Sequence, residues 1–97
     1  MKVLFHPEAE AEFFAAIDYY EEAESGLGHA YSIEVMATIN RIVALPMAWP
    51  VLSNELRRCL TNRFPYGVIY SIEPQAIFIL AVMHLCREPN YWQNRSK

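Results

Sequence analysis

Hydrophobic residues recur at helical spacing through the first half of the chain. A first helix is predicted to begin at Pro7, because proline is favoured at the first helical position and the glutamates after it suit the positive end of the helix dipole. Its apolar face consists of Ala9, Phe13, Ile17 and Tyr20. A second helix, ended by Pro46, has an apolar face of the same period formed by Leu27, Tyr31, Val35, Ile39, Ile42 and Leu45. Residues 24–28 separate the two, so we expect an antiparallel helical hairpin.

The second half of the chain changes to the period of β-strands. Residues 66–72 alternate in the way expected of a strand with two different faces. Residues 76–83 are uncharged and rich in β-branched and aromatic side chains, which indicates a strand buried on both faces. The break at residues 73–75 makes the two strands a hairpin. We also expect strands at residues 2–5 and near residues 57–61, with the first of the hairpin strands covering 65–72.

Together these elements predict an α+β fold in two layers, with the order β-α-α-β-β-β. An N-terminal strand, an antiparallel helical hairpin packed on a small antiparallel β-sheet and a short C-terminal segment make one domain, residues 1–97. The chain is 54% hydrophobic and 20% charged, which is apolar for a small domain, so part of that surface is expected to meet a partner. No apolar run approaches the ~18 residues of a membrane helix and no signal peptide is visible, so we expect a cytoplasmic protein that does not bind membranes.

Metal and cofactor chemistry has little support in the sequence. His6, His29 and His84 are far apart, and no His-x-x-x-His, Glu-x-x-His or cysteine cluster brings ligands together. No glycine-rich phosphate loop follows a strand. We therefore expect neither a metal nor a cofactor. Cys59 and Cys86 do not form a Cys-x-x-Cys motif and are expected to be reduced thiols without a redox role.

Charge is divided unevenly between the halves of the chain. Residues 1–50 carry eight acids against two bases, a net charge of −6, whereas residues 51–97 carry three acids against six bases, a net charge of +3. The acids are expected to form a solvated face of the first helix. Arginines interleaved with tyrosine and tryptophan are typical of surfaces that bind phosphates or bases, yet +3 is a small basic excess for a nucleic-acid-binding module.

Short motifs run along nearly the whole chain. In the first half they are His6-Pro7-Glu8-Ala9-Glu10, Tyr19-Tyr20-Glu21, Gly26-Leu27-Gly28 and Pro46-x-x-Trp49-Pro50. In the second half they are Arg57-Arg58, Arg63-Phe64-Pro65-Tyr66-Gly67, the apolar run 77–82 and His84-x-x-Arg87-x-Pro89-x-Tyr91-Trp92. In this order they resemble the RelE/ParE superfamily of toxins from bacterial type II toxin-antitoxin modules. The resemblance implies the fold predicted above and a cognate antitoxin protein as partner, which wraps the toxin as a helix and an added strand.

One activity that the resemblance implies is that of RelE-like toxins, which cleave messenger RNA in the ribosome. Arg58, Arg63 and Arg87 would then stabilise the charge on the phosphate, and His84 or Tyr91 would transfer protons. The chain departs from that pattern because residues 51–56 contain no lysine and the sequence pI is about 5.5. A chain with net charge −3 would forgo most of the counterion release that drives binding to ribosomal RNA.

ParE-like toxins fit these features better, because the resemblance then implies binding to and inhibition of DNA gyrase without a catalytic site. Residues 88–97 would form an exposed recognition element, and the residues expected to contact the target are Arg87, Tyr91, Trp92 and Arg95. For His84 a hydrogen-bonded structural role at a strand end is equally compatible with the sequence, and for Trp49 and Trp92 packing is favoured over stacking on a ligand. A third possibility is an inactive member that keeps only antitoxin binding.

Overall fold

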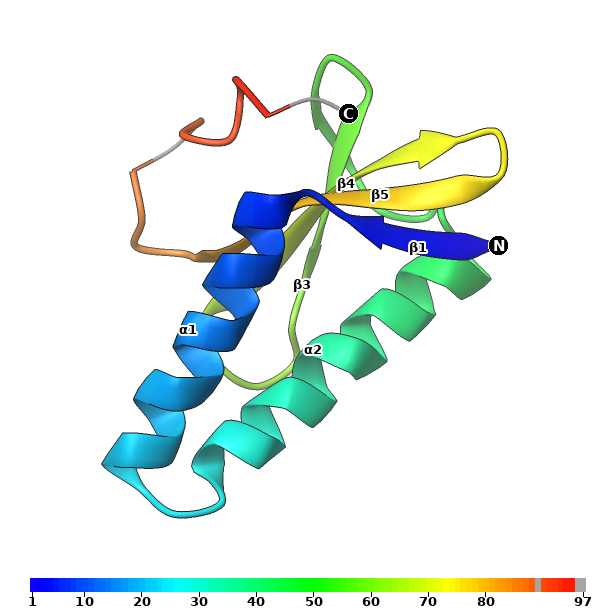
Figure 1. Ribbon diagram of the computed structural model, residues 1–97. Helices are drawn as coiled ribbons and strands as arrows, with labels where there is room; N and C mark the ends of the chain where they lie inside the picture. Colours follow the sequence, from blue (N-terminus) through cyan, green and yellow to red (C-terminus); the bar gives the residue numbers. More distant parts are fainter. Residues whose placement is uncertain (89, 96–97) are drawn as a thin grey trace.

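The computed structural model describes residues 1–88 and 90–95. In chain order its elements are β1 (Lys2–Phe5), α1 (Pro7–Ala23), α2 (Leu27–Ala44), β2 (Val51–Ser53), β3 (Leu56–Leu60), β4 (Tyr66–Glu73) and β5 (Ala76–His84). The two helices lie side by side across one face of a five-stranded sheet (Figure 1). The predicted α+β architecture is confirmed. Within the described residues, neither helix is both long enough and apolar enough to cross a membrane.

Side-chain hydrogen bonds cap the N-terminal ends of both helices. The His6 side chain caps α1, its Nδ1 accepting a hydrogen bond from the Glu8 N–H at 3.1 Å. The α2 N-terminus is capped by Glu21, a residue of α1, whose carboxylate accepts hydrogen bonds from Gly26 N (2.8 Å) and Gly28 N (3.0 Å). These backbone donors, that of Gly26 first, lower the pKa of Glu21. At Gly28 the helices approach so closely that a Cβ atom would collide with the Ile17 carbonyl oxygen.

The strand order is β1-β5-β4-β3-β2, and the sheet is mixed. All pairs from β2 to β5 are antiparallel, but β1 pairs parallel to β5, with Lys2 opposite Ala76. The expectation of an antiparallel sheet is therefore wrong for β1. The sequence also missed β2, which joins β3 through a two-residue turn at Asn54 and Glu55, both with positive φ (46° and 66°).

The sheet buries apolar side chains on both faces. The face toward the helices forms the main core, whose largest fully buried side chains include Tyr31, Tyr70, Ile39, Ile42, Ile77 and Ile79. On the opposite face a second cluster consists of Ile69, Phe78, Leu80, Ala81, Met83 and Trp92. Trp92 belongs to the chain after β5, so the C-terminal segment (described over residues 85–88 and 90–95) covers part of the sheet that the helices leave open. The prediction that β5 is buried on both faces is confirmed.

A bulge divides β5 into two halves. Ile69 pairs with Ala81 and Tyr70 with Ile79, which leaves Leu80 as the extra residue. The first half of β5 lies between β4 and β1, but β1 pairs only as far as Ile79. From Leu80 onward the edge of β5 that faces away from β4 has no strand beside it among the described residues. Backbone groups on that edge therefore need other partners.

Candidate functional site

Glu12 of α1 lies at the open edge of β5 and binds both the strand and the C-terminal segment. Its Oε1 accepts hydrogen bonds from Val82 N (3.1 Å) and from Arg95 Nη1 (2.9 Å). Its Oε2 accepts from Arg95 Nη2 (2.9 Å) and lies 3.4 Å from Arg87 Nη1. The Glu12 side chain is 14% exposed, so the expectation of a solvated acidic face is wrong for this residue.

Arg95 makes a bidentate ion pair with Glu12 and also donates from Nη1 to the Leu80 carbonyl at 2.9 Å. Its side chain is only 8% exposed. Hydrogen bonding to Glu12 raises the pKa of Arg95, which keeps the guanidinium charged. Arg95 and Glu12 thus take the place of a neighbouring strand at this edge of β5. Arg95 donates to the Leu80 carbonyl, and Glu12 accepts from the Val82 N–H.

Arg87 and Tyr91 form the outer part of this arrangement. The Arg87 guanidinium carbon lies 3.8 Å from the centre of the Tyr91 ring, and that of Arg95 lies 4.9 Å from the same centre. The Arg87 side chain is 51% exposed, so one side of its guanidinium is open to a partner. Burial is the main cause that raises the pKa of Tyr91, and the Glu12 carboxylate adds to it. We call Glu12, Arg87, Tyr91 and Arg95 the Glu12 cluster.

The exposed recognition element expected at residues 88–97 needs correction. Trp92 is 3% exposed and packs on the outer face of the sheet, and Arg95 is buried against Glu12, so neither presents a free side chain to a partner. The physical reason is that both faces of β4 and β5 are apolar, and the helices cover only one of them. Packing of Trp92, which the sequence favoured over stacking, is confirmed. Pro89, Ser96 and Lys97 lie outside the described residues.

His84 stands at the end of β5, where its Nδ1 accepts a hydrogen bond from Cys86 N at 3.0 Å. Its ring meets the edge of the Tyr66 ring at a centroid distance of 5.2 Å. His84 and Arg87 line an open hollow of about 270 Å³ between α1 and the end of β5, together with Glu12, Ala15, Ala16, Tyr66 and Val82. The structure therefore brings together three of the proposed catalytic residues, His84, Arg87 and Tyr91, since Tyr91 stacks on Arg87. One ring nitrogen of His84 already accepts a hydrogen bond.

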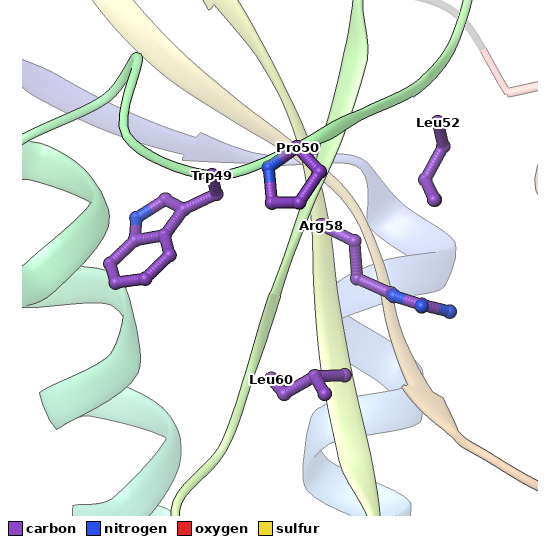
Figure 2. Close-up of a pocket in the computed structure, with 5 residues that line it drawn as sticks. All are labelled: Trp49, Pro50, Leu52, Arg58 and Leu60. Carbon is purple, nitrogen blue, oxygen red and sulfur yellow. The ribbon is translucent and has the colours of Figure 1, made fainter.

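Arg58 of β3 lies elsewhere, in a mostly apolar hollow of about 270 Å³ toward the β2 edge of the sheet. Its lining residues are Trp49, Pro50, Leu52, Arg58 and Leu60. Figure 2 shows Trp49 on one side of this hollow and the Arg58 side chain extending toward the other. Neighbouring Arg57 has a structural role, because its Nη1 donates to the carbonyl oxygens of Trp49 (2.7 Å) and Met47 (3.2 Å).

Arg63 lies in the turn between β3 and β4, with its guanidinium 5.3 Å from the centre of the Phe64 ring. Phe64 has a φ of 67° and is held by its contacts with Tyr20 and Tyr31. Arg58, Arg63 and the group formed by His84, Arg87 and Tyr91 thus occupy three different places. No group of three His, Cys, Asp or Glu side chains suited to a metal occurs in residues 1–88 and 90–95 either. A ribonuclease centre needs its groups around one phosphate, and Arg58 and Arg63 do not lie with His84, Arg87 and Tyr91.

Comparison with known proteins identifies the family. A family model described as the ParE toxin of the type II toxin-antitoxin system parDE matches residues 3–88. The chain belongs to the ParE toxin family. It is 34% identical over 86 residues to Toxin ParE2 of Mycobacterium tuberculosis strain CDC 1551 / Oshkosh, an alignment that covers 88% of this chain and 82% of the relative. Toxin ParE2 of strain H37Rv matches with the same values.

A solved structure supports the fold of this ParE-family toxin. The chromosomal ParDE toxin-antitoxin system from P. aeruginosa matches with a TM-score of 0.65, covering 88% of this chain and 96% of that one. Sequence identity is 16%, so this likeness concerns the fold alone. The expectation of a RelE/ParE superfamily toxin is confirmed and narrowed to the ParE toxin family.

Sequence reasoning missed Glu12 as a member of the candidate site. In the sequence it is one of several acids in α1, and only its place beside the apolar positions Ala9 and Phe13 sets it apart. Its partners Val82, Arg87 and Arg95 are 70, 75 and 83 residues away in the chain. An acid that borders the apolar stripe of an amphipathic helix is therefore the signal that could have indicated a buried ion pair.

Proposed function

We propose that this ParE-family toxin acts by binding and inhibiting DNA gyrase, without catalysing a reaction, and that a cognate antitoxin neutralises it. The observation that carries the proposal is that two of the three candidate arginines, Arg58 and Arg63, lie away from the group formed by His84, Arg87 and Tyr91. Membership of the ParE toxin family supports it. The net charge of −3 supports it as well, since a protein target does not require a strongly basic surface.

Arg87 and Tyr91 are the residues that we assign to target contact. An arginine stacked on an aromatic ring is held in one orientation, so its remaining donors can meet a partner's carboxylate or carbonyl group at a small entropic cost. Arg87 is half exposed and lies at the hollow that also contains His84. Trp92 and Arg95 belong to the same surface as its supports, because they fix the C-terminal segment on the sheet and on α1.

The antitoxin has a different surface available to it. The helical hairpin exposes Phe14 (54%), Tyr19 (68%), Ile33 (56%) and Met36 (43%), and the edge strand β2 exposes Val51 and Leu52. Exposed apolar side chains on helices and an unpaired strand edge are the features that an incoming helix or strand uses. Binding to the helical hairpin and to the edge of β2 would not itself cover the Glu12 cluster. The remainder of the antitoxin would have to cover that cluster or move the C-terminal segment. Both gyrase and antitoxin would meet the toxin in the cytoplasm.

The test uses the purified toxin with purified gyrase in a plasmid supercoiling assay, alongside a ribosome-dependent assay of transcript cleavage. We expect inhibition of supercoiling and intact transcripts. Arg87→Ala should raise the inhibitory concentration by about tenfold, the loss typical of a central interface arginine, whereas Arg63→Ala should leave it unchanged. Codon-phased cleavage that both substitutions abolish would overturn the proposal in favour of a ribonuclease. No effect in either assay, with antitoxin binding retained, would identify an inactive member.

A further inference from the structure

Glu12 contacts β5 and both arginines of the Glu12 cluster. A single carboxylate accepts hydrogen bonds from the backbone of β5 at Val82, from both terminal nitrogens of Arg95 and from Arg87. All of these distances fall between 2.9 and 3.4 Å. Glu12 itself is held on α1, a helix anchored in the main core through Ala9 and Phe13. The carboxylate is therefore a rigid point to which the C-terminal segment is tied.

The contacts of Glu12 also explain why the C-terminal segment lies where it does. From Leu80 onward the outer edge of β5 has no neighbouring strand in the described part of the chain, and its polar groups need partners. Arg95 supplies a donor to the Leu80 carbonyl and Glu12 supplies an acceptor to Val82 N. Each side chain satisfies the strand, and the two neutralise each other. Removing Glu12 leaves the buried Arg95 with only the more distant Glu8 carboxylate, 4.0 Å from its Nε. Removing Arg95 leaves Glu12 with the half-exposed Arg87 at 3.4 Å, so either change weakens a buried ion pair.

We propose that Glu12 is a positioning residue for target binding: it fixes Arg87 against Tyr91 and holds the C-terminal segment on β5. This inference rests on the proposed function, because it names the group that orients the surface assigned there to gyrase. Glutamate is required rather than glutamine because both carboxylate oxygens accept from arginine, whereas an amide would turn an NH₂ group toward one of them. Glu12 acts by orienting Arg87, which contacts the target, and Glu12 itself makes no contact with the target.

The experiment compares Glu12→Gln with the matched control Glu10→Gln, which removes a neighbouring but exposed acid from the same helix. The first readout is amide hydrogen exchange at Gln93 and Arg95, whose N–H groups donate to the carbonyls of Asn90 and Trp92. We expect exchange at these amides at least about tenfold faster in Glu12→Gln than in Glu10→Gln. Arg95→Gln, which breaks the pair from the other side, should give the same increase. Unchanged exchange in both variants would overturn the proposal.

The second readout is inhibition of gyrase, measured as a double-mutant cycle. Glu12→Gln should raise the inhibitory concentration about tenfold in the wild-type background but less than about twofold in Arg87→Ala, because its effect passes through Arg87. Equal effects in the two backgrounds would show a general loss of stability and would overturn the positioning role. If the wild-type toxin does not inhibit gyrase, the proposed function fails, and the exchange measurement still decides whether Glu12 holds the segment.

Discussion

Replacement of Trp92 by alanine tests whether the C-terminal segment is part of the folded domain. The Trp92 side chain is 3% exposed and packs against Ile69, Phe78, Leu80, Ala81 and Met83. An aromatic side chain buries about 150–250 Å², which at about 25 cal/mol per Å² corresponds to about 4–6 kcal/mol. Measured Trp→Ala substitutions in cores cost about 3–5 kcal/mol.

The cost of Trp92→Ala has an upper limit, because the segment can detach from the sheet instead of leaving a cavity. We therefore expect the lower end of the range, a loss of about 3 kcal/mol in the free energy of unfolding. A domain of this size has about 5–15 kcal/mol of stability in total, so the variant should still fold at 25 °C. Its melting temperature should fall by about 12–24 °C, given about 4–8 °C per kcal/mol for small domains.

Urea denaturation followed by far-ultraviolet circular dichroism measures this loss for Trp92→Ala and for the control Tyr19→Ala. Tyr19 is an aromatic residue that is 68% exposed, and its removal should cost less than about 1 kcal/mol. A loss at Trp92 no larger than that at Tyr19 would refute the reasoning. It would mean that Trp92 does not pack on the sheet.

Three further predictions concern the scaffold. Gly28→Ala should lower the free energy of unfolding by about 2 kcal/mol in urea titrations, because crowding against Ile17 and Glu21 outweighs the gain of about 1 kcal/mol in helix propensity; a more stable variant would contradict this. Glu55→Gly should raise the melting temperature through a gain of about 0.5–1 kcal/mol, since its φ of 66° suits glycine, and a loss would show that the turn has another conformation. The pKa of Glu21 is lowered in the folded state, so its stabilisation is present above the ordinary glutamate pKa of about 4.3 and disappears as the pH falls through the lower folded value. Unfolding titrations should accordingly show wild type more stable than Glu21→Gln at pH 7 and equal to it near pH 2; a constant difference would contradict this.

The sequence predicted six of the seven elements, including the short strands β1 and β3, and the pattern was clearest in the long ones. Both helices, β4 and β5 each contain eight or more residues, and their apolar positions repeat over several turns or alternations. β2 has three residues, too few for a period, and its turn carries Asn54-Glu55 in place of the usual Asn-Gly. The parallel direction of β1 relative to β5 could not be predicted from local periodicity either, because it depends on how the whole chain returns to the first strand.

The candidate site was predictable only in part, since its residues are distributed over the chain. Arg87 and Tyr91 are close in sequence, and their stacking agrees with their expected place in one surface. The burial of Trp92 depends on an apolar outer sheet face, and the sequence of β4 and β5 shows that this face exists but not what covers it. The role of Glu12 depends on partners at least 70 residues away; its place beside the apolar stripe of α1 could indicate a buried acid but not which residues it meets.

The uneven distribution of charge has a structural reason in the short edge strands. β1 ends opposite Ile79, and beyond it the edge of β5 is met by Glu12 from α1 and by Arg95. On the other side β2 pairs with β3 only as far as Arg57. Beyond that point Arg41 of α2 donates to the Leu60 carbonyl at 3.2 Å, the counterpart of the Arg95 bond on β5.

Side chains of the two helices, Glu12 and Arg41, thus hydrogen-bond to backbone groups on both sides of the sheet where a short edge strand ends. A helix acid that satisfies a strand edge, as Glu12 does, needs a backbone donor or a base from the C-terminal half as its partner. Part of the negative charge of residues 1–50 therefore lies against the sheet instead of in solvent. In this fold the region around β5 stays open to a partner because a pair of side chains, not a strand, closes its edge. A longer β1 would cover Leu80 and Val82 and would remove the need for Glu12 and Arg95, and with it the group that orients Arg87.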